Sequence, residues 1–114
     1  EQGPIAVLVA QLRDGTAQKK TEAALSLANL AFNYAGAIPL LIRLLRDGTD
    51  EGKAEAARAL WGLTLHADNV VTIAAAGAIP LLIALLRDGT ERGKYNAAWA
   101  LCSLSYNADN RVII

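Results

Sequence analysis

Three features of the sequence contain residue types that could do chemistry: one histidine, one cysteine and a recurring Arg-Asp-Gly-Thr segment. His66 stands alone, whereas zinc sites combine several His or Cys ligands, so we expect a solvated residue at a helix end and no metal. Cys102 has no cationic neighbour in sequence, which predicts an inert, partly buried thiol. The Arg-Asp-Gly-Thr segments lack the spaced acidic ligands of a calcium loop. Without a phosphate-binding or nucleophile motif, the sequence predicts no enzyme and no cofactor.

The segments that would position these residues are repeated along the chain. Gly36–Thr49 and Gly77–Thr90 are identical except for Arg43 against Ala84, and Gly3–Thr16 is a weaker copy. The starting glycines lie 33 and then 41 residues apart. Self-similarity at such a period is typical of stacked repeats, in which no unit buries its apolar face alone.

Helix signals divide each unit into elements. Pro39 lies where a first-turn proline costs nothing, and the leucines that follow it form a wide apolar stripe. We expect Gly48 and Gly89 to end their helices in the left-handed conformation, with Thr49 and Thr90 capping the next helices. The next helix of the middle unit should bury four small or branched side chains, namely Ala56, Ala57, Leu60 and Leu63. Asp68-Asn69 should cap a short helix from Val70 to Ala76 that ends at Gly77.

Charge and composition exclude several classes of function. Eleven basic and eleven acidic residues among 114 give a net charge of zero, which disfavours a nucleic-acid binder and a polybasic membrane-surface segment. The 54% hydrophobic content disfavours disorder. Residues 23–42 and 69–86 carry no charge, but a Gly-Ala-Ile-Pro break within each predicts two short buried helices rather than a membrane span.

Two further features concern the origin of the chain. The single cysteine favours a reducing compartment. The start at Glu-Gln-Gly-Pro suggests a piece of a longer protein.

These units resemble the armadillo repeat family, and within it importin-α-like and multi-repeat vacuolar and protist members. The GAIPLLxxLLRDGT segments resemble the second helix of that repeat, the AAxALxxL segments the third, and the stretch after Ala-Asp-Asn the first. The resemblance implies an all-α fold, a right-handed α-solenoid (alpha-alpha superhelix) in a single domain. The units would span about 3–35, 36–76 and 77–114, with a truncated fourth unit from about 109. About eight residues are missing between Asn33 and Gly36, so we expect the middle unit to lack its first helix.

In armadillo proteins the third helices line a concave groove that holds an extended peptide, and helical spacing aligns a set of residues on that face here. In importin-α-like members a Trp stacks on a lysine stem and an Asn four residues later holds the peptide backbone. That pair is incomplete in this chain, so we expect weak binding of Lys/Arg-rich peptides. The candidate peptide-binding residues are Glu22, Leu25, Asn29, Glu55, Arg58, Trp61, Gly62, Asn96, Trp99 and Ser103.

Other interpretations of these residues stay open at this point. Arg58 and Trp99 hold equivalent positions on neighbouring helices about 8–10 Å apart, so Arg58 should cover the Trp99 ring in place of a ligand lysine. Trp61 and Trp99 could instead serve ordinary packing between repeats. Glu22 and Glu55 could attract basic ligands or be solvated helix charges.

The function that this resemblance implies is a non-enzymatic module that binds an extended peptide or partner protein, in the cytoplasm or nucleus. The alternative is an architectural or engineered fragment that mainly self-assembles, as a dimer or larger oligomer, because repeats at the ends of a solenoid need polar caps. The candidate self-association residues are Ile5, Leu8, Leu12, Phe32, Tyr34, Ile83, Leu86, Leu101 and Leu104.

Overall fold

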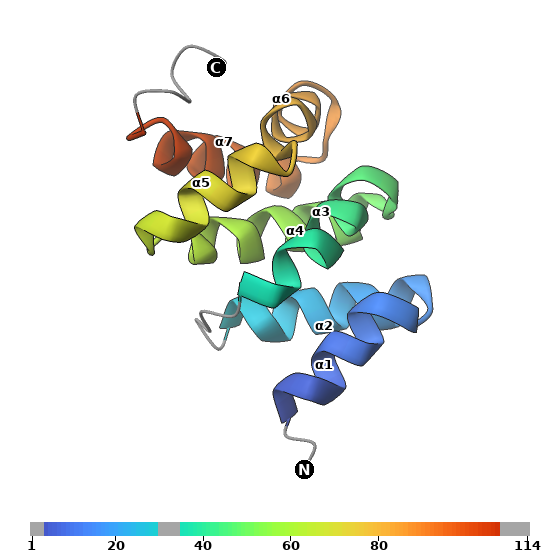
Figure 1. Ribbon diagram of the computed structural model, residues 1–114. Coiled ribbons are helices and arrows are strands. Elements are labelled where there is room, and N and C mark those ends of the chain that lie inside the picture. Colours follow the sequence, from blue (N-terminus) through green and yellow to red (C-terminus); the bar gives the residue numbers. More distant parts are fainter. Residues whose placement is uncertain (1–3, 30–34, 108–114) are drawn as a thin grey trace.

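The computed structural model describes residues 4–29 and 35–107, and these residues form α-helices and one 3₁₀ turn with no strand (Figure 1). This confirms the predicted all-helical fold. In chain order the elements are α1 (Pro4–Asp14), α2 (Ala17–Asn29), η1 (Ala35–Ala37), α3 (Ile38–Asp47), α4 (Asp50–Leu63), α5 (Ala67–Ala75), α6 (Ala78–Asp88) and α7 (Glu91–Leu104).

The helices form two layers of a stack. α2, α4 and α7 lie side by side in one layer, with α4 in contact with both of the others (Figure 1). α1, α3 and α6 form the second layer. Each packs against the helix that follows it in the chain, and α3 also contacts α1 and α6. Each helix pair therefore covers the apolar side of its neighbour, as expected for a solenoid.

The core runs continuously through this stack. Leu60 and Leu63 of α4 are buried, as the repeat pattern predicts, together with the small residues Ala56 and Ala57 that let neighbouring helices approach closely. The largest side chains with almost no exposure come from five helices, and they are Ile38, Leu41, Leu60, Ile73, Ile79, Leu82 and Leu104.

Threonine caps begin the helices of the first layer, as predicted. The Thr49 hydroxyl accepts a hydrogen bond from the backbone N–H of Gly52 at 3.0 Å, and the Thr90 hydroxyl accepts one from Gly93 at 3.1 Å. Each bond satisfies a backbone donor that the first turn of a helix leaves free.

The glycines before these caps differ from the prediction. Gly48 and Gly89 have φ of −77° and −79°, which is extended backbone and not the left-handed conformation. Glycine is required at these positions because any side chain would clash with the backbone: a Cβ at Gly48 would lie 2.5 Å from the carbonyl oxygen of Leu44. Among the glycines that the structure describes, the left-handed one is Gly77, at φ 93° between α5 and α6.

The short helix α5 also begins earlier than predicted. It starts at Ala67 after His66, so Asp68 and Asn69 lie inside it and do not cap it. The Asn69 side chain is buried and donates from Nδ2 to the carbonyl oxygen of Leu63 at 3.0 Å, which ties α5 to the end of α4.

No counterpart of α5 precedes α3 in the described part of the chain, where only η1 stands. Residues 30–34 lie outside the described residues, so the predicted repeat boundaries stay a prediction. Within the described residues no single helix is long and apolar enough to cross a membrane, and α5 and α6 would pass that test only as a pair bent by 81°.

Candidate functional site

The exposed side of α4 and α7 carries three aromatic rings in contact. Trp61 of α4 stacks on Trp99 of α7 with ring centroids 5.5 Å apart and planes at 15°. Tyr95, one helical turn before Trp99, meets it edge-on at 6.4 Å. Trp99 keeps 44% of its surface exposed and Tyr95 keeps 60%. We call these three residues the aromatic cluster; it presents a large apolar surface with free ring edges to solvent.

The stacking of the two tryptophans corrects the predicted position of Arg58. Sequence spacing placed Arg58 over Trp99, but Trp61, three residues further along α4, covers that ring. Arg58 is half-buried and lines a cavity beside Trp61 instead. In the described part of the chain it has no ion-pair partner.

This open cavity lies between α2 and α4 and has a volume of about 220 Å³. Ala28, Arg58, Trp61, Gly62 and Leu65 line it, and we call it the Arg58 cavity. Gly62 leaves it open, because a Cβ at that position would meet nothing within 4 Å. The lining is apolar apart from the guanidinium, so the cavity can accept an apolar side chain with a negative group beside it.

Two predicted ligand contacts are buried in the stack. Asn96 is 4% exposed, and its Nδ2 donates to the backbone oxygen of Ala54 at 2.9 Å, which joins α7 to α4. Glu55 is 3% exposed, and its Oε2 pairs with Nη2 of Arg92 at 2.6 Å. Its Oε1 is buried without a hydrogen-bond partner among the described residues. Both predicted peptide-binding side chains are therefore buried between α4 and α7 and are not presented to a ligand.

The remaining predicted residues of this face differ in exposure. Glu22 is exposed and accepts a hydrogen bond from Gln18 at 2.9 Å, while Leu25 and Ser103 are half-buried. Asn29 ends α2, and its side chain lies outside the described residues. The structure thus brings Arg58, Trp61, Gly62 and Trp99 together.

Sequence reasoning missed Tyr95 and Leu65. Tyr95 lies four residues before Trp99, a spacing that places both on one helix face and could have revealed it. Leu65 follows the end of α4, where helical spacing no longer applies.

Neither His66 nor Cys102 lines the Arg58 cavity. His66 is exposed at the start of α5. Cys102 is exposed, which corrects the prediction of partial burial. Among the described residues no three His, Cys, Asp or Glu side chains gather as metal ligands would.

The N-terminal set of predicted self-association residues is less exposed than expected. Leu12 is buried at 2% exposure, whereas Ile5 and Leu8 are half-buried. Phe32 and Tyr34 lie outside the described residues.

At the C-terminal end, burial corrects half of the predicted set. Leu101 and Leu104 are buried, because α7 turns them toward the core. Ile83 is half-buried and Leu86 is 40% exposed, so among these four residues only the two on α6 keep exposed surface.

With the fold and this geometry established, the chain can be compared with known proteins. A model of the Armadillo/beta-catenin-like repeat matches residues 35–65 and 66–106, which together exceed half of the chain. The chain belongs to the armadillo repeat family. This confirms the family that the repeated segments suggested. No curated protein matches the chain.

Several solved structures superpose well on this one. A crystal structure of an engineered protein from the Northeast Structural Genomics Consortium has a TM-score of 0.79 at 28% identity, over 89% of this chain and 45% of the other. A second engineered protein from that consortium has a TM-score of 0.80 at 27% identity, over 95% and 49%. A designed armadillo repeat protein in complex with the peptide (KR)4 has a TM-score of 0.75 at 28% identity, over 84% and 44%. The chain spans less than half the length of these proteins.

Proposed function

We propose that this armadillo module binds an extended peptide segment of a partner protein along the exposed side of α2, α4 and α7, without catalysis. The observation that carries the proposal is the aromatic cluster beside the Arg58 cavity. The exposed Trp99, stacked on the half-buried Trp61, offers a large rigid contact area, and aromatic anchors dominate binding energy at interfaces. The peptide complex of the designed armadillo protein supports the class of ligand.

The charges around the cavity favour a ligand other than a basic peptide. Arg58 has no ion-pair partner in the described residues, whereas the carboxylate of Glu55 is buried and already paired with Arg92. A lysine or arginine at the cavity would therefore meet a like charge with no accessible carboxylate to offset it. We propose a peptide that places an apolar side chain between Ala28 and Trp61 and an acidic residue opposite Arg58.

A fluorescence titration tests this function. A peptide-array screen with the protein would identify binders, and tryptophan emission would then follow each binder in solution, because Trp61 and Trp99 are the two tryptophans of the chain. Trp99→Ala should weaken binding at least tenfold, since a central aromatic anchor contributes about 2 kcal/mol or more. Val71→Ala is the matched control, because Val71 is 57% exposed on α5.

The substitution Arg58→Ala separates the two kinds of peptide. It should weaken an acidic, apolar binder and strengthen (KR)4 by up to about tenfold, because it removes one charge from the cavity. An array without binders, or equal losses from Trp99→Ala and Val71→Ala, would contradict the proposed function. An unchanged affinity for (KR)4 in Arg58→Ala would contradict only the ligand preference.

Self-association is the second candidate, supported by uncovered apolar side chains at both ends of the stack. Val7 of α1 is 50% exposed and Leu86 of α6 is 40% exposed. Because each is already about half buried, covering the exposed remainder between copies contributes about 1 kcal/mol each. Light scattering at about 100 µM should then show species above 12.0 kDa, and a single monomeric species would exclude this candidate.

We also propose an intracellular location, in the cytoplasm or the nucleus. The family resemblance and the single cysteine support it.

A further inference from the structure

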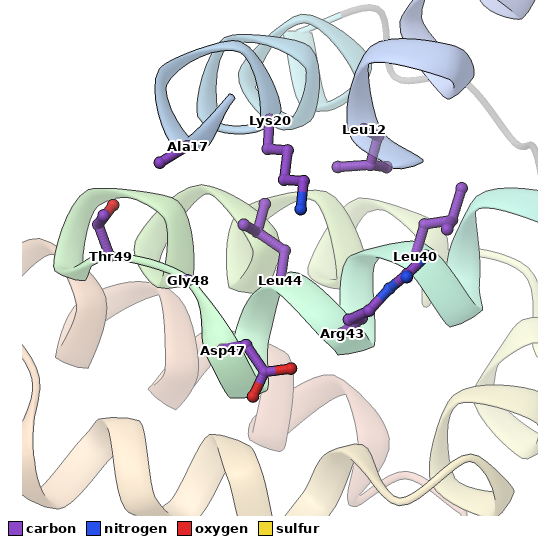
Figure 2. Close-up of a pocket in the computed structure, with 9 residues that line it drawn as sticks. All are labelled: Leu12, Ala17, Lys20, Leu40, Arg43, Leu44, Asp47, Gly48 and Thr49. Carbon is purple, nitrogen blue, oxygen red and sulfur yellow. The ribbon is translucent and has the colours of Figure 1, made fainter. Parts of the chain in front are cut away.

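Two cavities lie at equivalent places between successive helix pairs. The first has a volume of about 200 Å³ and lies between α1 and α2 on one side and α3 and the start of α4 on the other (Figure 2). The second, of about 190 Å³, lies one repeat further along, between α3, α4 and α6. The first cavity adjoins Thr49 at the start of α4, whereas the aromatic cluster adjoins the end of that helix. It is therefore separate from the proposed peptide site.

Apolar walls give the first cavity room for a small ring. Leu12 of α1 and Leu40 and Leu44 of α3 line it. An apolar protein cavity of about 150 Å³ accommodates benzene, so a volume of about 200 Å³ accommodates a six-membered ring with one further small group.

Two cations line this space. Figure 2 shows the Lys20 side chain reaching from α2 into the gap above α3, with its ammonium end between Leu12 and Leu44. Arg43 lines the same cavity from α3. Among the described residues neither Lys20 nor Arg43 makes an ion pair. Two like charges beside an unfilled apolar space are complementary to an anion that carries an apolar group.

The carboxylate that also lines the cavity does not supply this anion. Asp47 pairs with its neighbour Arg46 at 3.1 Å. In Figure 2 its carboxylate points away from Lys20. Lys20 and Arg43 are therefore available to bind the anionic group of an external ligand.

The second cavity has a similar volume but a different charge. Ala84 stands there where the first cavity has Arg43, and Asp50 stands where the first has Ala17. The first cavity therefore has two cations and one carboxylate, whereas the second has two cations and two carboxylates. The full list of charged residues is Lys20, Arg43 and Asp47 in the first, and Arg46, Lys53, Asp50 and Asp88 in the second.

We propose that the first cavity, the Lys20–Arg43 cleft, binds a small organic carboxylate with a compact apolar ring. The Lys20 ammonium and the Arg43 guanidinium hold the carboxylate, and Leu12, Leu40 and Leu44 contact the ring. The second cavity does not bind this class, because it lacks the excess positive charge.

Benzoate is the probe, and backbone amide NMR spectra report on both cavities at once. Benzoate should shift the amide signals of Gly48 and Thr49 in the first cavity and leave those of Gly89 and Thr90 beside the second unchanged. Benzyl alcohol, which has the same ring without the charge, should bind at least tenfold more weakly. Equal shifts at both cavities, or equal affinities for the two probes, would overturn the proposal.

Substitutions then locate the charge that matters. Arg43→Ala places in the first cavity the alanine that the second cavity has at the equivalent position, Ala84. It should raise the Kd for benzoate about fivefold or more. Arg13→Ala, at an exposed arginine paired with Asp14, is the matched control and should leave the Kd unchanged. Because Arg43 is exposed, the variant should fold normally, and its circular dichroism spectrum checks this.

A gain of function completes the test. The double variant Asp50→Ala with Ala84→Arg gives the second cavity the residues of the first at these two positions, and with Arg46 and Lys53 it leaves three cations against one carboxylate. It should make Gly89 and Thr90 respond to benzoate. A correctly folded double variant without that response, or an Arg43→Ala variant with the original Kd, would refute the assignment.

Discussion

Removing Arg92 should destabilise the protein much more than removing any other paired arginine. The Arg92 guanidinium makes the only ion pair of the described residues that reaches a buried carboxylate, at 2.6 Å from Oε2 of Glu55. A hydrogen bond to a charged group contributes about 1.5–3 kcal/mol, and the loss of one partner leaves a buried charge uncompensated. Because the Arg92 side chain is itself 54% exposed, solvent screening places the expected loss near the lower limit, at about 1.5–2 kcal/mol.

Urea unfolding followed by circular dichroism measures this loss, and thermal unfolding should show a Tm about 6–8 °C lower. Arg13→Ala is the control, because Arg13 and Asp14 are both exposed and adjacent in sequence; it should change stability by less than about 0.5 kcal/mol. Adding Glu55→Gln to Arg92→Ala should recover about 1 kcal/mol by removing the buried charge. If Arg92→Ala is as stable as the control, or if the double variant recovers nothing, the interaction between these two side chains has been misjudged.

The backbone supplies further predictions, all checked by urea unfolding. Gly48→Ala should cost about 2 kcal/mol or more, because its Cβ would lie 2.5 Å from the carbonyl oxygen of Leu44, and a stable variant would contradict the crowding argument. Gly62→Ala should instead stabilise α4 by about 0.5–1 kcal/mol, since its Cβ meets nothing within 4 Å, and a loss of stability would show strain at this position. Thr49→Ala and Thr90→Ala should each cost about 1 kcal/mol through the lost cap, with nearly additive effects in the double variant; strong non-additivity would indicate that the two helix starts are coupled.

The sequence was sufficient for the elements and their order because its local signals are strong. Threonine before an acidic residue marks the starts of α4 and α7, and the bonds from Gly52 and Gly93 to the threonine hydroxyls confirm both caps. Leucine and alanine spacing identified the buried side of α4, including Leu60. These features depend on a few neighbouring residues, so a single chain contains the information for them.

The contacts between helices were less predictable. Arg58 and Trp61 lie three residues apart on adjacent parts of the same helix surface, and the relative angle of α4 and α7 decides which of them reaches Trp99. Helical spacing defines a face but does not supply that angle. The burial of Glu55 and Asn96 was missed for the same reason, because both lie at the border between the exposed side and the seam with a neighbouring helix.

The exposed position of Cys102 makes the protein convenient for attaching a reporter. It is the only cysteine of the chain, and it lies three residues after Trp99, on the same side of α7. A maleimide dye would therefore attach at one defined point beside the aromatic cluster without any substitution elsewhere. Its emission would fall or rise when a ligand changes the contact between the dye and the tryptophans. The unmodified sequence therefore already provides the attachment point for a sensor of its own ligands.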